Sequence, residues 1–386
     1  MTAATIAVVG AGPVGLAAAL QVAAVGYDVA LIAPPSPPAD ARTSALLAGS
    51  VGLLERLGVW ADLAADAAPL RTMRIVDGTR RLIRAPEIAF EAGEIGLSAF
   101  GYNVANAALV AALERAVAAR SGSIARVNAF AGEVAFTDDS VTVALSTGES
   151  AVARLVIAAD GRRSRLRDAA GIAIDEWSYP QAALVCNLAH SLPHHDASTE
   201  FHTETGPFTL VPLAGNRSSL VWVDTPAESR RRLALSDADI AAEIETRSAS
   251  ILGAITVEAP RQVFPLSGMT VARFAADRVM LVGEAAHMFP PIGAQGLNLG
   301  YRDVAALGDV LAGPHADPGD AGRLDAYDRA RRLDVMTRTA AVDALNRTLL
   351  TDFLPVEAIR GLGLFLIDSI PPLRRFAMRQ GVAAGT

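Results

Sequence analysis

The chain has 386 residues, of which 51% are hydrophobic, enough to bury a large core in two closely packed domains. Its net charge of −7 and its pI near 5.5 argue against a nucleic-acid partner. The one cysteine, Cys186, cannot form an intrachain disulfide, so we expect a cytoplasmic protein. Every basic residue is an arginine, and the lack of lysine excludes Schiff-base chemistry and a P-loop lysine.

The N-terminal residues 5–32 have the pattern of a strand, a glycine turn, an alanine-rich helix and a second strand. Gly10, Gly12 and Gly15 follow the G-x-G-x-x-G spacing of a dinucleotide-binding turn. In such a turn the first glycine makes the bend, the second admits the pyrophosphate, and the third lets helix and strand pack. The acid expected after the second strand is replaced by Ala33, so the ribose must be held partly by other groups. Residues 5–27 are uncharged, but their glycines and Pro13 predict a strand, a turn and a buried helix, not a membrane span.

In two later segments, a buried strand is also followed by a turn that contains an acid. Residues 155–167 form an apolar strand that ends in Asp160 and continues into a basic turn. Residues 278–303 form another strand, then Gly283 and Glu284, a proline and glycine loop, and a helix from near Gly296. The glycines permit close backbone approach, and the helix N-terminus favours an electron-rich ring such as a reduced flavin. A strand that ends in Asp-Gly is often only a turn, but the three segments together indicate one cofactor.

The cofactor segments are far apart in sequence and must meet on one ligand. We therefore predict an α/β fold with a discontinuous, Rossmann-like FAD-binding domain made of residues 1–70, 98–178 and 265–325. Apolar segments at 182–188, 208–212 and 218–224 predict antiparallel strands. We assign them to an interleaved substrate-binding sheet domain, residues 71–97 and 179–264, that roofs the flavin. Residues 326–386 are predicted to form a C-terminal helical region.

These motifs resemble the single-component flavoprotein aromatic hydroxylases typified by para-hydroxybenzoate hydroxylase, and the resemblance covers nearly the whole chain. Residues 283–303, Arg42, the helix end at 53–58 and residues 371–376 look most like the ubiquinone-biosynthesis hydroxylases. The chain departs from the family at three positions. Glu284 stands where Asp is usual, Pro290 where the ubiquinone branch often has His, and Ala33 where an acid is common.

The resemblance implies a set of FAD contacts. The glycine turn would hold the pyrophosphate, Arg42 would approach the diphosphate, and Asn106 would lie beside the ribityl chain. Asp160 and Glu284, the latter following Gly283, would accept hydrogen bonds from cofactor hydroxyls. From the residues alone, Arg42 is equally compatible with a plain surface arginine, and Asn106 with a helix N-cap.

The loop and helix after Glu284 would face the isoalloxazine ring. The loop residues Pro290, Pro291 and Gly293 would border its reacting face. Backbone N–H groups at the helix start would stabilise the anionic reduced flavin at its N1–C2=O edge, and the residues concerned are Gly296, Leu297, Asn298 and Leu299.

The histidines suggest other chemistry at first sight. His287 could be a general base, but a histidine just after a buried strand is more often a satisfied packing group, and the flavin does the difficult chemistry. The cluster His190, His194, His195 and His202 lies in a polar loop without clean ligand spacing, so we expect surface imidazoles and no metal site.

The family mechanism implies the reaction. NAD(P)H reduces FAD, the reduced flavin traps O2 as a C4a-hydroperoxide, and its distal oxygen passes to an electron-rich phenol in a dry pocket. The substrate expected here is a polyprenyl phenol of ubiquinone biosynthesis. A same-fold flavin prenyl reductase and a non-enzymatic FAD-binding redox protein remain alternatives. A flavin halogenase does not, since the chain lacks its catalytic lysine and its Trp-x-Trp-x-Ile-Pro segment.

The C-terminal residues 353–386 combine arginines with apolar residues, and Arg360, Arg374, Arg375 and Arg379 outnumber two acids. Such a mixture predicts peripheral contact with the inner membrane, where a prenylated substrate resides. The alternative is packing on the FAD domain or in a subunit interface. We also consider assembly with other quinone-biosynthesis enzymes.

Overall fold

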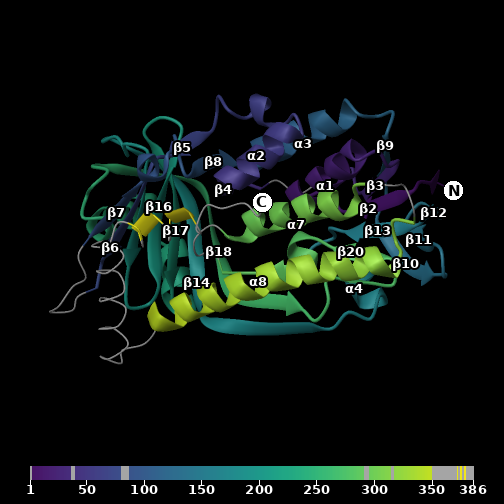
Figure 1. Cartoon of the computed structure of the whole chain (residues 1–386). Coiled ribbons are helices and arrows are strands. Elements are labelled where there is room, and N and C mark those ends of the chain that lie inside the picture. The colour runs from purple at the N-terminus through teal and green to yellow at the C-terminus, as the bar shows by residue number, and fades with distance from the viewer. Residues whose placement is uncertain are drawn as a thin grey trace.

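The computed structural model describes residues 2–35, 40–79, 87–290, 295–313 and 317–349, with the backbone alone for 295 and 338–349. Near the C-terminus it describes residues 372, 374, 375, 378 and 379. Figure 1 shows two layered parts, a mainly parallel sheet with helices at one end and a large, mainly antiparallel sheet at the other. The long helix α8 (Ala321–Leu349) runs between the two ends in this view.

The parallel sheet has six strands in the order β19, β20, β13, β2, β3, β9, with β19 antiparallel to β20. The bounds of its strands are Ala275–Ala276, Val279–Leu281, Leu155–Ala158, Ile6–Val9, Val29–Ala33 and Ile124–Asn128 in that order. Strands β2, β3 and β13 are short apolar runs buried on both faces, as parallel strands covered by helices are. The predicted strands at the three cofactor segments thus become neighbours.

Helices cover this sheet. α1 (Pro13–Ala24) begins with a proline at its first turn and buries three of its five alanines together with Leu16, Leu20 and Val22, which explains its apolar composition. The uncharged stretch is therefore a strand, a turn and a buried helix, as predicted. The other helices of this part are α2 (Ala48–Arg56), α3 (Asn106–Ala118), α4 (Arg165–Ala169) and α7 (Gln295–Leu311). Among the described residues, no helix is long and apolar enough to cross a membrane.

Two small sheets and three short 3-10 turns complete this half. One sheet joins β1 (Thr2–Ala3), β12 (Ser150–Ala153), β11 (Val141–Leu145) and β10 (Ala131–Phe136). The other joins β4 (Thr43–Leu47), β8 (Gly101–Ala105) and β5 (Ala68–Leu70). The 3-10 turns are η1 (Trp60–Asp62), η2 (Ala92–Ile95) and η3 (Gly283–Ala285).

The eight-stranded sheet has the order β21, β18, β14, β17, β16, β15, β6, β7. The bounds in that order are His287–Met288, Ile255–Val271, Ile174–His190, Arg217–Asp224, Pro207–Leu213, Ala197–His202, Thr72–Asp77 and Ile88–Glu91. The antiparallel strands predicted at 182–188, 208–212 and 218–224 are confirmed as parts of β14, β16 and β17. Helices α5 (Pro226–Leu233) and α6 (Asp237–Arg247) accompany this sheet, and α6 contributes Ile240 and Ile244 to its core.

Two strands of 17 residues, β14 and β18, pair along their length and pass from one half of the chain to the other. The boundaries drawn at 178 and 264 fall inside them, and the boundary at 325 falls inside α8. Near that boundary α8 is fastened to the parallel sheet: the hydroxyl of Tyr327 donates to the carbonyl of Leu281 at 2.8 Å, and Asp328 accepts from the N–H of Phe274 at 2.7 Å. The division into domains remains a prediction, with continuous elements across its borders.

The described part of the C-terminus packs on the chain itself. Arg374 donates to both carboxylate oxygens of Glu94, at 2.7 and 2.8 Å, and lies over the ring of Phe90. Met378 is buried beside Ala92 and Phe100. Arg374 therefore already has an acidic partner within the chain, and contact of this segment with a membrane remains a prediction. Arg360 lies outside the described residues.

Candidate cofactor site

The predicted cofactor segments meet at one edge of the parallel sheet. β2 and β20 pair with β13 on either side, and all three strands run parallel. Their carboxyl ends therefore lie side by side, and the turns that follow contain Gly10, Asp160 and Gly283. Crevices outside the carboxyl ends of parallel strands are where ligands bind in open α/β sheets.

The glycines of the N-terminal turn have different surroundings. At Gly10, which has φ +111°, a β-carbon would lie 2.1 Å from the carbonyl oxygen of Ala159. At Gly15 it would lie 2.1 Å from the carbonyl oxygen of Gly10. At Gly12 it would meet nothing within 4 Å. Gly10 and Gly15 thus serve the packing of the chain on itself, whereas Gly12 borders space at the N-terminus of α1, which has no side-chain cap. This is the arrangement that a pyrophosphate requires.

Asp160 has one carboxylate oxygen bonded and one without a partner. Its Oδ2 accepts from the backbone N–H of Arg165 at 2.9 Å. Its Oδ1 is buried and has no hydrogen-bond partner among the described residues. Burial raises the pKa of Asp160, although hydrogen bonds oppose the rise. A buried acceptor without a donor is costly, and a ligand hydroxyl would satisfy it.

Glu284 lies in the turn η3 that follows β20, and its side chain is exposed. The pKa of Arg42 is raised first by its hydrogen bonds to Asp40 and further by the charge of Glu284. Arg42 and Glu284 are therefore electrostatic neighbours, although they are far apart in sequence. An exposed acid at a strand end is suited to accept hydrogen bonds from a ligand.

Arg42 and Asn106 are joined through Asp40, which the sequence analysis missed. Arg42 donates to Oδ1 and Oδ2 of Asp40 at 2.8 and 2.9 Å, and Asn106 donates to Oδ2 at 2.8 Å. Burial opposes the ionisation of Asp40, but these bonds lower its pKa to about 2. Asn106 is not the N-cap of α3, since that position is Ala105 and carries no side-chain bond. Its Oδ1 accepts instead from the hydroxyl of Ser44 at 2.6 Å.

The start of α7 lies next to strand β4, which follows Arg42 in the sequence. In a helix that begins at Gln295, the N–H groups of the first turn, including those of Gly296 and Leu297, have no partner within the helix itself. Leu299 is the fifth residue of the helix, a position whose N–H bonds within a regular helix, so its predicted contact with the ring edge stays a prediction. Asn298 uses its side chain: Oδ1 accepts from the N–H of Leu47 at 2.8 Å and the hydroxyl of Ser50 at 2.6 Å.

The loop predicted to face the flavin is described only at its first residue. Pro290 is buried at the end of the segment that follows β21. Pro291 and Gly293 lie outside the described residues, so their roles stay predictions.

His287 is a buried group, as predicted, and its partner was missed. Its Nε2 lies 2.7 Å from Oδ2 of Asp303, and both side chains are almost fully buried. Asp303 falls in a run at four-residue spacing whose other members, Leu299, Leu307 and Leu311, are buried and apolar. An acid within such a stripe is the signal that could have revealed it.

His195 is exposed, as expected of a surface imidazole, but His190 and His202 differ from that expectation. His190 and His202 are each only 7% exposed. His190 donates to the carbonyl of Leu192 at 2.7 Å, and His202 lies 2.8 Å from Glu200. These rings are satisfied structural groups of the large sheet. Within the part of the chain that the structure describes, no three His, Cys, Asp or Glu side chains are grouped to hold a metal.

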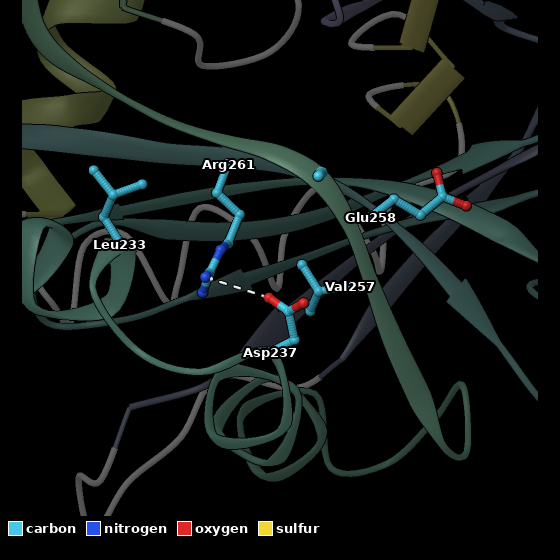
Figure 2. Close-up of a pocket in the computed structure, with 6 residues that line it drawn as sticks. Leu233, Asp237, Val257, Glu258 and Arg261 are labelled. Atoms are coloured by element: carbon cyan, nitrogen blue, oxygen red, sulfur yellow. Dashed lines mark ion pairs between the residues drawn. The ribbon is translucent and has the colours of Figure 1, made fainter.

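Two hollows open on the large sheet, apart from the predicted cofactor residues. The smaller, of about 280 Å³, is lined by Leu233, Asp237, Val257, Glu258, Ala259 and Arg261. In Figure 2 the guanidinium of Arg261 points at Asp237, 3.3 Å away. Arg261 also donates to the carbonyl of Leu235 at 2.8 Å, so its charge is already engaged. The larger hollow, of about 880 Å³, lies between α6 and strands β6, β15 and β17.

Comparison with known proteins agrees with this geometry. The family model described as FAD binding domain matches residues 3–342. Ubiquinone hydroxylase UbiL of Rhodospirillum rubrum is 34% identical, over 98% of this chain and 89% of the relative. The 3-demethoxyubiquinol 3-hydroxylase of Escherichia coli is 34% identical, over 97% of each. The crystal structure of p-nitrophenol 4-monooxygenase PnpA from Pseudomonas putida has a TM-score of 0.78 at 22% identity, covering 98% of each chain.

The last likeness shows the fold alone, because its sequence identity is low. The family model and the two long relatives show more, since they span almost the whole chain. The chain therefore belongs to the FAD binding domain family, among whose members it is similar to ubiquinone-biosynthesis hydroxylases.

Proposed function

We propose that this protein is an FAD-dependent monooxygenase that hydroxylates the aromatic ring of a polyprenylated intermediate of ubiquinone biosynthesis, with NAD(P)H and O2 as co-substrates. The observation that carries the proposal is the 34% identity to two hydroxylases over nearly the whole chain. The site supports it, because an open glycine turn, a buried acceptor at Asp160 and a helix N-terminus meet at one sheet edge.

When bound, FAD would take electrons from NAD(P)H and supply the oxygen-transfer chemistry. The residues of the chain would bind and orient it. The N-terminus of α1 at Gly12 would hold the pyrophosphate, and the carboxylates of Asp160 and Glu284 would accept from hydroxyls. The N–H groups of Gly296 and Leu297 would stabilise negative charge on the ring edge.

We propose that Arg42 approaches the diphosphate while it stays paired with both carboxylate oxygens of Asp40. This pair fixes the direction of the guanidinium. The Arg42 side chain remains 48% exposed, so it can still meet an anionic group from solvent. The guanidinium lies 5.4 Å from the ring centroid of Phe264, on the strand that enters the large sheet. Asn106 would help indirectly, since it also holds Asp40.

Turnover distinguishes this proposal from its alternatives. We expect NAD(P)H oxidation and O2 consumption that depend on a polyprenyl phenol, and a product that carries one oxygen atom from isotopically labelled O2. A prenyl reductase would instead return a substrate with two added hydrogens and no label. A redox carrier would give no product. Either result, obtained with the FAD-loaded protein and several prenyl phenols, would overturn the assigned reaction.

Gly12→Val should abolish FAD binding while the protein stays folded. A β-carbon at Gly12 meets no part of the chain, so the added side chain would obstruct the ligand and leave the fold intact. FAD absorbance after gel filtration and the circular dichroism melting curve measure the two effects. Gly93→Val is the matched control, because Gly93 is equally open and lies outside the site. Full retention of FAD by Gly12→Val would refute the assignment of this turn.

Asp160→Ala and Glu284→Ala should each weaken FAD binding by about 1–3 kcal/mol, the cost of leaving a buried polar partner unpaired. Titration of apo-protein with FAD measures the affinity. Glu133→Ala, an exposed acid on β10, should leave it unchanged. Because Asp160 also accepts from Arg165, the unfolding free energy of each apo-variant is measured in parallel. Unchanged FAD affinity in both variants would remove these roles.

We also propose that the C-terminal segment touches an anionic membrane surface. Arg375 and Arg379 are exposed. Two apolar side chains of α8, Leu333 and Met336, are also 75% and 61% exposed. Replacing both arginines with glutamine should weaken co-sedimentation with anionic vesicles by about 2 kcal/mol, or roughly 30-fold. Neutral vesicles serve as one control. Arg374→Gln serves as the other, because Arg374 is already bound to Glu94. A wild-type protein that never sediments at low salt would contradict the proposal.

A further inference from the structure

One buried carboxylate joins the turn after β20 to two helices. Asp303 of α7 has no exposed surface. Its Oδ2 accepts from the backbone N–H of Gly283 at 2.8 Å and lies 2.7 Å from Nε2 of His287. Its Oδ1 accepts from Nε of Arg331 on α8 at 2.7 Å. One oxygen of this side chain thus holds the turn η3 and His287, and the other oxygen holds α8.

The turn has little freedom to settle elsewhere. Gly283 has φ +59°, a conformation that L side chains rarely adopt. On the adjacent turn of α7, a β-carbon at Gly300 would lie 2.6 Å from Val14 of α1 and 3.4 Å from the Cα of Gly283. The backbones of η3 and α7 are therefore in direct contact, and the bond from Gly283 to Asp303 sets their relative position.

Arg331 of α8 balances the negative charge of Asp303. Burial opposes ionisation, but the charges of His287 and Arg331 hold the pKa of Asp303 below its ordinary value. Arg331 also donates to Asp334 at 2.8 Å, and Arg302 donates to both oxygens of Asp334 at 2.8 and 2.6 Å. The chain of pairs runs from the cofactor turn through α7 to α8. A buried carboxylate without these partners would be strongly unfavourable.

We propose that Asp303 is a positioning residue for the cofactor pocket, through which Arg331 of α8 sets the placement of Glu284 and of the N-terminus of α7. The proposal rests on the FAD-binding function proposed above. Asp303 itself has no exposed surface and does not touch the ligand. Its effect on FAD binding passes through the turn Gly283–Ala285 and the helix that both border the ligand.

The test compares Asp303→Asn with Asp224→Asn. Asp224 is also a buried carboxylate paired with an arginine, Arg232 at 2.7 Å, but it lies in the large sheet. Asp303→Asn should weaken FAD binding by about 2- to 30-fold, a usual range for residues that act through a packed network. Asp224→Asn should lower the unfolding free energy of the apo-protein and leave FAD affinity unchanged.

A coupling measurement separates positioning from general stability. In a Glu284→Ala background, Asp303→Asn should cost clearly less FAD affinity than in wild type, because the turn no longer presents its carboxylate. Equal costs in the two backgrounds, or an unchanged affinity in Asp303→Asn, would overturn the inference. Should Asp303→Asn fail to fold, Arg331→Gln supplies the same comparison with the carboxylate kept. A wild-type apo-protein that takes up no FAD would overturn the proposed function as well, whereas the outcomes above overturn this inference alone.

Discussion

Close packing of glycine backbones around one side chain, that of Val14, is the constraint on which this structure depends. The turn after β2, the turn after β20 and helix α7 all meet around Val14, where β-carbons at Gly15, Gly283 and Gly300 would lie within 3.4 Å of neighbouring atoms. Glycine is the residue that allows such approach. Once these backbones touch, β2, β13 and β20 must run parallel with their ends together. The cofactor site is the consequence of this packing.

A chain without lysine holds its interior loops with arginine. Arg167 is 3% exposed and donates to the carbonyls of Arg162 and Ala285 at 3.0 and 3.2 Å, which joins the Asp160 turn to the Glu284 turn. Arg331 does the same for α8 and α7 through Asp303. Buried ion pairs contribute little net stability, because desolvation offsets attraction. Their effect here is geometric, since the planar guanidinium fixes several acceptors at once.

The sequence predicted those parts of the site that local pattern determines. Strand ends, the glycine turn and the start of α7 follow from apolar runs and glycine spacing, and the structure places them where expected. Partners across long separations had no local signal. Asp40 meets Asn106, and Glu94 meets Arg374, only because distant strands and helices pack together. For the same reason the alternative of an N-cap role for Asn106 is wrong, since its neighbours in space are Ser44 and Asp40.

At the cofactor edge the two halves of the molecule are joined by a continuous strand and by hydrogen bonds between strands. β18 begins in the large sheet, pairs near its end with β21, at Met269 with Met288 and at Thr270 with His287, and leads into the parallel half. The turn η3 is thus bounded by Asp303 on one side and by this pairing on the other. Phe264, earlier on β18, faces Arg42. A substrate held by the large sheet would therefore be placed against the cofactor by strands that belong to both halves, without relying on a flexible linker.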